Sequence, residues 1–118
     1  MILQTKLLKE ALQKVSPAAP KGQAVVPVLE HVWIETDGTS VKVKMSNLAE
    51  TIETTFETKE ANKKEVILPY YKDLFDYVKL VNEVDIELKG VEGSVEIKAG
   101  KAKSKINGED QESYPTRS

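Results

Sequence analysis

The chain has 118 residues, of which 40% are hydrophobic and 31% are charged, and its formal net charge is −2 at pH 7. This length and balance are typical of one globular domain and exclude a disordered chain. With no cysteine and one histidine, the sequence excludes a disulfide framework, a thiolate nucleophile, a cysteine-ligated zinc and a multi-histidine metal site. It contains no apolar run long enough to span a membrane and no signal peptide, so we expect a cytoplasmic protein.

The first half of the chain predicts a strand, a helix and three further strands. Residues 6–16 are typical of an amphipathic helix, because their apolar side chains recur at helical spacing on one face. The Asp37-Gly38 dipeptide is a strong hairpin signal between two apolar runs, and the polar residues 58–64 predict a connector. The strands of this half are expected at 1–5, 25–36, 40–45 and 50–57.

The second half repeats this order. Residues 70–81 predict another amphipathic helix, and the strands are expected at 65–68, 83–88, 94–98 and 101–106. Alternating strands bury one face, which the two helices can cover. We therefore predict a single α+β domain over residues 1–118. It is built from two strand–helix–three-strand halves whose helices pack on antiparallel sheets.

Lysine is concentrated in residues 1–22 and 98–105, whereas residues 83–96 are mainly acidic. Lys101, Lys103 and Lys105 occupy every second position and so share one face of the last predicted strand. Two interpretations stay open for them. They protect an edge strand from aggregation, or they form a functional edge that pairs with a partner strand or faces phosphate.

Both predicted helices carry lysine on their polar faces, with neither arginine nor an aromatic stripe. This composition argues against base readout and single-strand stacking. Sequence-independent phosphate contact and a merely solvated helix face are both compatible with it. Tyr77 and Leu80 lie off the apolar stripe of the second helix, as expected either for a protein contact or for a stray apolar pair.

The sequence offers no catalytic constellation. His31 is flanked by Glu30 and Val32 at the start of a predicted strand. A general base needs a positioned nucleophile and an orienting group, and we predict instead an ordinary histidine on a strand surface. No phosphate-binding glycine motif and no calcium-loop spacing is present. We expect no catalytic residue, no metal and no cofactor. A small enzyme that depends on His31 is the least favoured alternative.

An ordered series of segments along the whole chain resembles a known family. These segments are LLKEALQKVS (7–16), VVPVLEHVWIETDG (25–38), MSNLAETIETTF (45–56), VILPYYKDLFDYVKLVNEVDIEL (66–88), VEIKAGKAKSKI (95–106) and the tripeptide Ser113-Tyr114-Pro115. Together they resemble the first domain of the bacterial sliding clamp, the beta subunit of DNA polymerase III. The strand–helix–three-strand repeat agrees with this resemblance.

The resemblance implies a non-catalytic replication processivity factor. Clamps of this family are rings of six similar domains, three in each subunit, closed head to tail as a dimer. Their helices line the hole and face duplex DNA, and their sheets form the outer wall. The ring slides and tethers the replicative polymerase, and the polymerase and the clamp loader are expected as partners of the full-length ring. The acidic residues 83–96 would lie on that outer wall.

The resemblance also implies roles for individual residues. The residues expected to face DNA are Lys6, Lys9, Lys14, Lys21, Gln23, Lys72 and Lys79. Gln23 stands where the family often has a DNA-contacting arginine, and Lys21 is a substitute nearby. The residues expected at the subunit interface are Tyr77, Val81, Lys101, Lys103, Ser104 and Ile106. Ser104 stands where the family often has an aromatic side chain.

The chain corresponds to one of the family's three domains, and we expect an excised N-terminal domain with weak, salt-sensitive DNA affinity or none. The family's pocket for partner peptides would lie in the later domains. The alternative is a single-domain clamp relative from a mobile element. Such a protein would bind the edge of a clamp subunit as an interaction module and would need no DNA.

Overall fold

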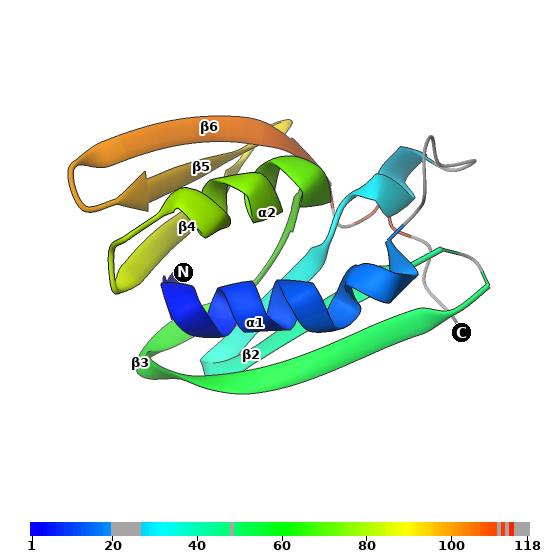
Figure 1. Cartoon of the computed structure of the whole chain (residues 1–118), viewed down its shortest axis with the longest axis horizontal. Helices are drawn as coiled ribbons and strands as arrows, with labels where there is room; N and C mark the ends of the chain where they lie inside the picture. The colour runs from blue at the N-terminus through cyan, green and yellow to red at the C-terminus, as the bar shows by residue number, and fades with distance from the viewer. Residues whose placement is uncertain (20–26, 48, 111, 113, 115–118) are drawn as a thin grey trace.

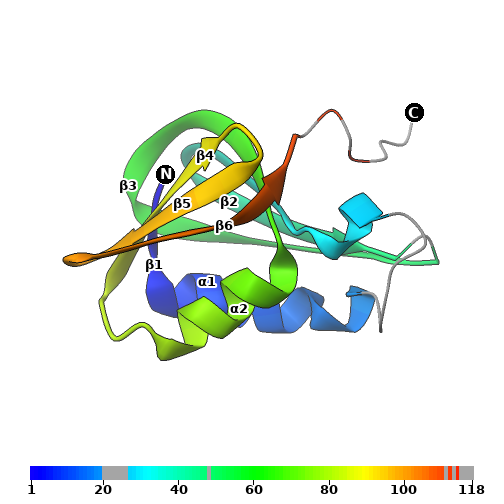
Figure 2. The same ribbon diagram turned by 90° about the horizontal axis from the view of Figure 1, so that it is seen from above.

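A computed structural model of the chain describes residues 1–19, 27–47, 49–110, 112 and 114. Its elements in chain order are β1 (Ile2–Gln4), α1 (Thr5–Val15), the short 3-10 helices η1 (Ser16–Ala18) and η2 (Pro27–Glu30), β2 (Trp33–Ser46), β3 (Thr51–Pro69), α2 (Tyr71–Leu80), β4 (Asp85–Val91), β5 (Ser94–Ala99) and β6 (Ala102–Glu109). The two α-helices lie side by side in one layer, and the strands lie on the other side (Figure 1 and Figure 2). The α+β class and the two helices on antiparallel sheets are confirmed.

The strands are hydrogen-bonded in the order β1-β4-β5-β6-β3-β2, and every pairing is antiparallel. β4, β5 and β6 form a meander with tight connections. β6 meets β3 only at its end, where Leu68 pairs with Glu109 and Pro69 with Gly108. This short contact joins the strands of the second half to those of the first.

β2 folds back on itself at Gly38. The Lys44 ammonium lies 4.6 Å from the centre of the Trp33 ring, although the two residues are 44 − 33 = 11 positions apart. A straight strand would separate them by about 36 Å. Gly38 has a φ of 65°, a left-handed conformation that glycine adopts without a Cβ clash. The Asp37-Gly38 hairpin predicted from the sequence is therefore confirmed.

β3 also bends, because its 19 residues would extend about 63 Å if straight, whereas the longest dimension of the molecule is 37 Å. Figure 2 shows the strand curving over the sheet. Its pairing with β2 shifts between Glu57, opposite Ser40, and Asn62, opposite Gly38. The connector predicted at 58–64 was wrong in form, because these polar residues continue the strand through the bend.

The bend is held by hydrogen bonds to β1. The Asn62 amide oxygen accepts from the Ile2 N–H at 2.9 Å, and the Asn62 amide nitrogen donates to the Ile2 carbonyl at 3.2 Å. The Thr58 hydroxyl donates to the same carbonyl at 3.4 Å. The side chain of Asn62 thus pairs with β1 as a neighbouring strand would. With both bends counted, each half contains a strand, a helix and three strand segments, as predicted. The strand expected at 25–36 was wrong at its start, because Pro27–Glu30 form the 3-10 helix η2 and β2 begins at Trp33.

The helices bury the faces that their periodicity predicts. Leu8, Leu12 and Val15 of α1 are fully buried, as is Leu74 of α2. The Tyr71 hydroxyl donates to the Leu12 carbonyl at 2.9 Å, which fixes α2 against α1. Because both apolar faces point into the sheets, the polar faces of the two helices form one exposed layer. In the described part of the chain, no helix is long and apolar enough to cross a membrane.

Candidate nucleic-acid and docking surfaces

The exposed face of α1 is basic. Lys6 and Lys14 are exposed, Lys9 is half-buried, and Glu10 is the one acidic residue of the helix. Three lysines and one glutamate leave a net charge of 3 − 1 = +2. The buried stripe of α1 lies on the opposite side, so this charge is directed away from the core.

The exposed face of α2 is electrically neutral. Lys72 and Lys79 are balanced by Asp73 and Asp76, and all four side chains are exposed. The Lys79 ammonium lies 3.4 Å from an Asp76 carboxylate oxygen. It also lies 4.9 Å from the centre of the Phe75 ring. The side chain of Lys79 is therefore folded along its own helix.

The five described residues of the predicted DNA-facing set lie on α1 and α2, in the exposed helix layer of Figure 2. They are Lys6, Lys9, Lys14, Lys72 and Lys79. The other two predicted residues, Lys21 and Gln23, lie outside the described residues. The helix layer thus gathers lysines that are more than 50 positions apart in the sequence. Their contact with DNA stays a prediction.

β6 presents an open strand edge. Ala102 to Asn107 pair with β5 on one side, and no strand of the described chain pairs with Ala102 to Ile106 on the other side. Ser104 and Ile106 are half-buried and face the helices, whereas Lys103 and Lys105 are exposed on the outer face. An unpaired edge of this kind can accept a strand from another chain.

Lys101, also predicted at the interface, is exposed in the turn before β6 and is not part of the strand as predicted. The remaining two predicted interface residues lie at the end of α2. Tyr77 and Val81 are half-buried and pack against the main core. Leu80 is 82% exposed and Val84 is 68% exposed. The sequence predicted an exposed pair of Tyr77 and Leu80, which was wrong for Tyr77, because its side chain packs on the core. Whether these residues contact a subunit is still untested.

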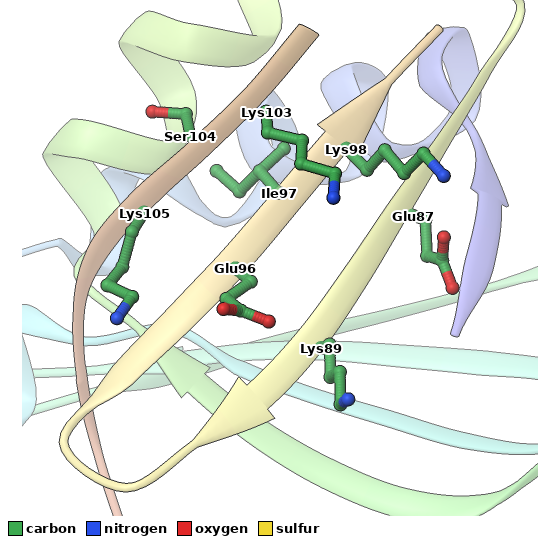
Figure 3. Close-up of a pocket in the computed structure, with 8 residues that line it drawn as sticks. All are labelled: Glu87, Lys89, Glu96, Ile97, Lys98, Lys103, Ser104 and Lys105. Carbon is green, nitrogen blue, oxygen red and sulfur yellow. The ribbon is translucent and has the colours of Figure 1, made fainter. Parts of the chain in front are cut away.

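A shallow hollow of about 510 Å³ lies on the outer face of the β4-β5-β6 meander (Figure 3). Its lining residues are Glu87, Lys89, Glu96, Ile97, Lys98, Lys103, Ser104 and Lys105. Four lysines and two glutamates give a net charge of 4 − 2 = +2. We expected an acidic outer wall from residues 83–96. That expectation was wrong for this face, because the register places the lysines of β5 and β6 beside Glu87 and Glu96.

A second apolar cluster lies apart from the main core. Tyr114 is only 4% exposed and packs with Leu29 and Leu68, and its ring centre lies 5.3 Å from that of Trp33. The Lys44 ammonium lies 5.3 Å from the Tyr114 ring as well as near Trp33. Burial raises the pKa of Tyr114. No periodic pattern in the sequence predicts this cluster, because its members come from four separate segments.

His31 is not on the surface, as the sequence suggested, but is 9% exposed. It forms an isolated antiparallel bridge with Tyr70, and the two rings meet edge to face at 5.5 Å. The bridge and the ring contact thus join the segment just before β2 to the junction between β3 and α2. Among the residues that the structure describes, no group of three or more histidine or acidic side chains could hold a metal ion.

Comparisons with known proteins agree with this geometry. The family model of the DNA polymerase III beta subunit, N-terminal domain, matches residues 1–118. The DNA polymerase III subunit beta of Pseudomonas aeruginosa superposes with a TM-score of 0.89 at 21% identity, over 100% of this chain and 32% of that one. The beta subunit of Streptococcus pyogenes gives 0.86 at 22% identity, over 99% and 32% of the two chains.

The sliding clamp of Bacillus subtilis gives 0.86 at 21% identity, over 99% of this chain and 33% of that one. No curated protein sequence matches the chain. Because the match covers only 32% or 33% of each of these three solved structures, the chain spans about a third of their length. Because the family model covers all 118 residues, the chain belongs to the family of the N-terminal domain of the DNA polymerase III beta subunit.

Proposed function

We propose that the chain is one domain, over residues 1–118, of a replication clamp. In this role it contributes part of a ring that encircles duplex DNA and tethers the replicative polymerase. In this proposed role the domain catalyses no reaction. The clamp loader and the polymerase act on the complete ring. Its main support, beside the family, is the single exposed layer in which α1 and α2 lie side by side with five lysines.

Lysine suits the proposed contact because the clamp must slide. Each ammonium is a flexible, hydrated point charge that attracts phosphate without a fixed bidentate geometry. A net charge of +2 on α1 and zero on α2 is small for a DNA-binding surface. The lone domain is therefore proposed to bind DNA weakly, and retention of the complete clamp depends on encirclement.

The lysine contact is tested by fluorescence anisotropy with a labelled DNA duplex at several salt concentrations. We expect weak binding whose affinity falls linearly on a log–log plot of affinity against salt. A variant with Lys6, Lys9 and Lys14 changed to Gln should lose this binding. A matched variant with Lys98, Lys103 and Lys105 changed to Gln should keep it. Equal losses in both variants would contradict the proposed helix contact.

The open edge of β6 is proposed as the surface that meets the next subunit, together with Tyr77 and Val81. A partner strand placed beside Ala102–Ile106 would extend the sheet through backbone hydrogen bonds. Sedimentation equilibrium tests this edge directly. Assembly that increases with concentration, and that is abolished by Lys103→Glu with Ile106→Asp, would support it. Assembly that survives this double change would place the interface elsewhere.

The same open edge also supports the alternative of a module that binds a clamp edge without DNA. The two functions differ in what the helix lysines do. If the Lys6, Lys9 and Lys14 variant binds a clamp subunit as the parent does, and the parent does not bind duplex DNA at low salt, the interaction module is the better account.

A further inference from the structure

We propose that Asp76 competes with DNA phosphate for Lys79, so that α1 carries most of the phosphate contact of this domain and α2 carries little. This inference rests on the proposed contact between the helix layer and DNA. It assigns Asp76 the role of a residue that weakens that contact. Such weakening would favour sliding over fixed binding.

The first support is the geometry of Lys79. Its ammonium lies 3.4 Å from an Asp76 carboxylate oxygen one helical turn earlier, and 4.9 Å from the centre of the Phe75 ring. Two attractive partners on the same helix thus hold the side chain back. By contrast, in the described part of the chain no lysine of α1 lies within ion-pair distance of a carboxylate.

The second support is the charge of each helix. α1 has a net charge of +2, and α2 has none because Asp73 and Asp76 offset its two lysines. An approaching phosphate is therefore attracted to α1, but near Asp76 it meets a carboxylate of its own sign. To bind Lys79, the phosphate must displace Asp76 and remain beside it.

The ion pair is expected to contribute little to folding stability. Lys79 and Asp76 have side chains that are 46% and 56% exposed, and ion pairs this exposed contribute little to stability. Removing the carboxylate should therefore change the DNA contact without changing the fold. The helix also offers a matched control, because Asp73 carries the same charge and is exposed but lies in no ion pair of the described chain.

The test compares Asp76→Asn with Asp73→Asn in the full chain, using anisotropy of a labelled duplex over a range of salt. One added phosphate contact steepens the log–log salt slope by about 0.9, which is roughly a threefold change in affinity between about 50 mM and 200 mM salt. We expect this steepening for Asp76→Asn. For Asp73→Asn we expect a smaller rise in affinity with an unchanged slope, because it removes repulsion without releasing a lysine.

A double-mutant cycle completes the test. Lys79→Gln should have little effect in the parent chain, because Lys79 is already occupied. In the Asp76→Asn background, Lys79→Gln should abolish the steeper slope and leave only a gain as small as that of Asp73→Asn. Thermal unfolding followed by circular dichroism should give midpoints within a few degrees of one another, because Asp73 in the first turn and Lys79 in the last turn of α2 each interact only weakly with the helix dipole. A fold retained in all variants excludes unfolding as the cause.

Three results would contradict the inference, and one of them would also contradict the proposed DNA contact. If the parent binds duplex through α1 but Asp76→Asn and Asp73→Asn have identical slopes, Asp76 does not compete for Lys79 and the inference is wrong. The same holds if Lys79→Gln weakens the parent as much as Lys6→Gln does. If no variant binds duplex even at the lowest salt, the proposed DNA contact fails and the inference fails with it.

Discussion

Tyr114 offers the sharpest test of the packing in this fold, because it is almost completely buried near the end of the described chain. Its ring contacts Trp33, and it packs with Leu29 and Leu68. Change to alanine removes roughly 200 Å² of buried aromatic surface, which is worth at most about 5 kcal/mol. Partial collapse of the site and a compact unfolded state reduce this, so we expect Tyr114→Ala to cost about 3 kcal/mol.

Tyr114→Phe is the matched control. Among the described residues, the Tyr114 hydroxyl is buried without a hydrogen-bond partner. An unsatisfied buried polar group lowers stability by about 1–3 kcal/mol. Removing the hydroxyl while keeping the ring should therefore leave stability unchanged or raise it.

The assay is urea unfolding, followed by circular dichroism and by the fluorescence of Trp33, the one tryptophan of the chain. With an m-value of about 1.5 kcal/mol per molar, a loss of about 3 kcal/mol lowers the urea midpoint by roughly 2 M. Tyr114→Ala should also move the Trp33 emission to longer wavelength in the folded state. An unchanged midpoint for Tyr114→Ala, or a large loss for Tyr114→Phe, would refute the reasoning.

Three further predictions address other parts of the molecule. Burial is the main cause that raises the pKa of both Tyr71 and Tyr114 above the ordinary value of 10.0. The unfolded chain therefore releases these protons first, so the contribution of the two tyrosines to stability should be constant below about pH 10 and fall above it, and Tyr114→Phe should reduce that fall in alkaline urea titrations. Asn62→Leu should lower stability by about 1 kcal/mol, because it removes two exposed hydrogen bonds to the Ile2 backbone; an unchanged midpoint would contradict the role of Asn62 in the bend. Gly38→Val should cost about 1–2 kcal/mol or more in the same assay, because valine is strained at positive φ; a neutral effect would contradict the turn.

Local patterns were enough to predict the helices and the first hairpin. Leu8, Leu12 and Val15 recur at helical spacing and are buried together. Asp37-Gly38 predicted a turn because glycine tolerates positive φ, and Gly38 has that conformation. In both cases the physical cause lies within a few residues of its effect.

Contacts between distant segments could not be predicted in this way. Residues 58–64 are polar and read as a connector, but the Asn62 side chain hydrogen-bonds Ile2, 60 positions away. No residue near His31 in the sequence indicates its contact with Tyr70. Such contacts depend on the folded register, which polar residues do not specify.

The surface charge, too, could be predicted only in part from the sequence. The sequence correctly assigned lysine to both helices, but it did not predict that Lys79 is held in an ion pair. The ion pair between Lys79 and Asp76 makes the two helices different. On the outer face, the acidic residues of β4 predicted an acidic surface. Only the strand register shows that lysines of β5 and β6 lie beside them.

The central claim is that the helix layer, and not the outer sheet, faces DNA. It is tested most directly by chemical-shift mapping, in which the isotope-labelled chain is titrated with a DNA duplex at low salt and the backbone amides are followed. The account predicts salt-sensitive shifts centred on α1 around Lys6, Lys9 and Lys14, with the outer face around Lys98 and Lys103 unaffected. Both surfaces carry a net charge of +2, so shifts centred on the outer face of β5 and β6 would contradict the account.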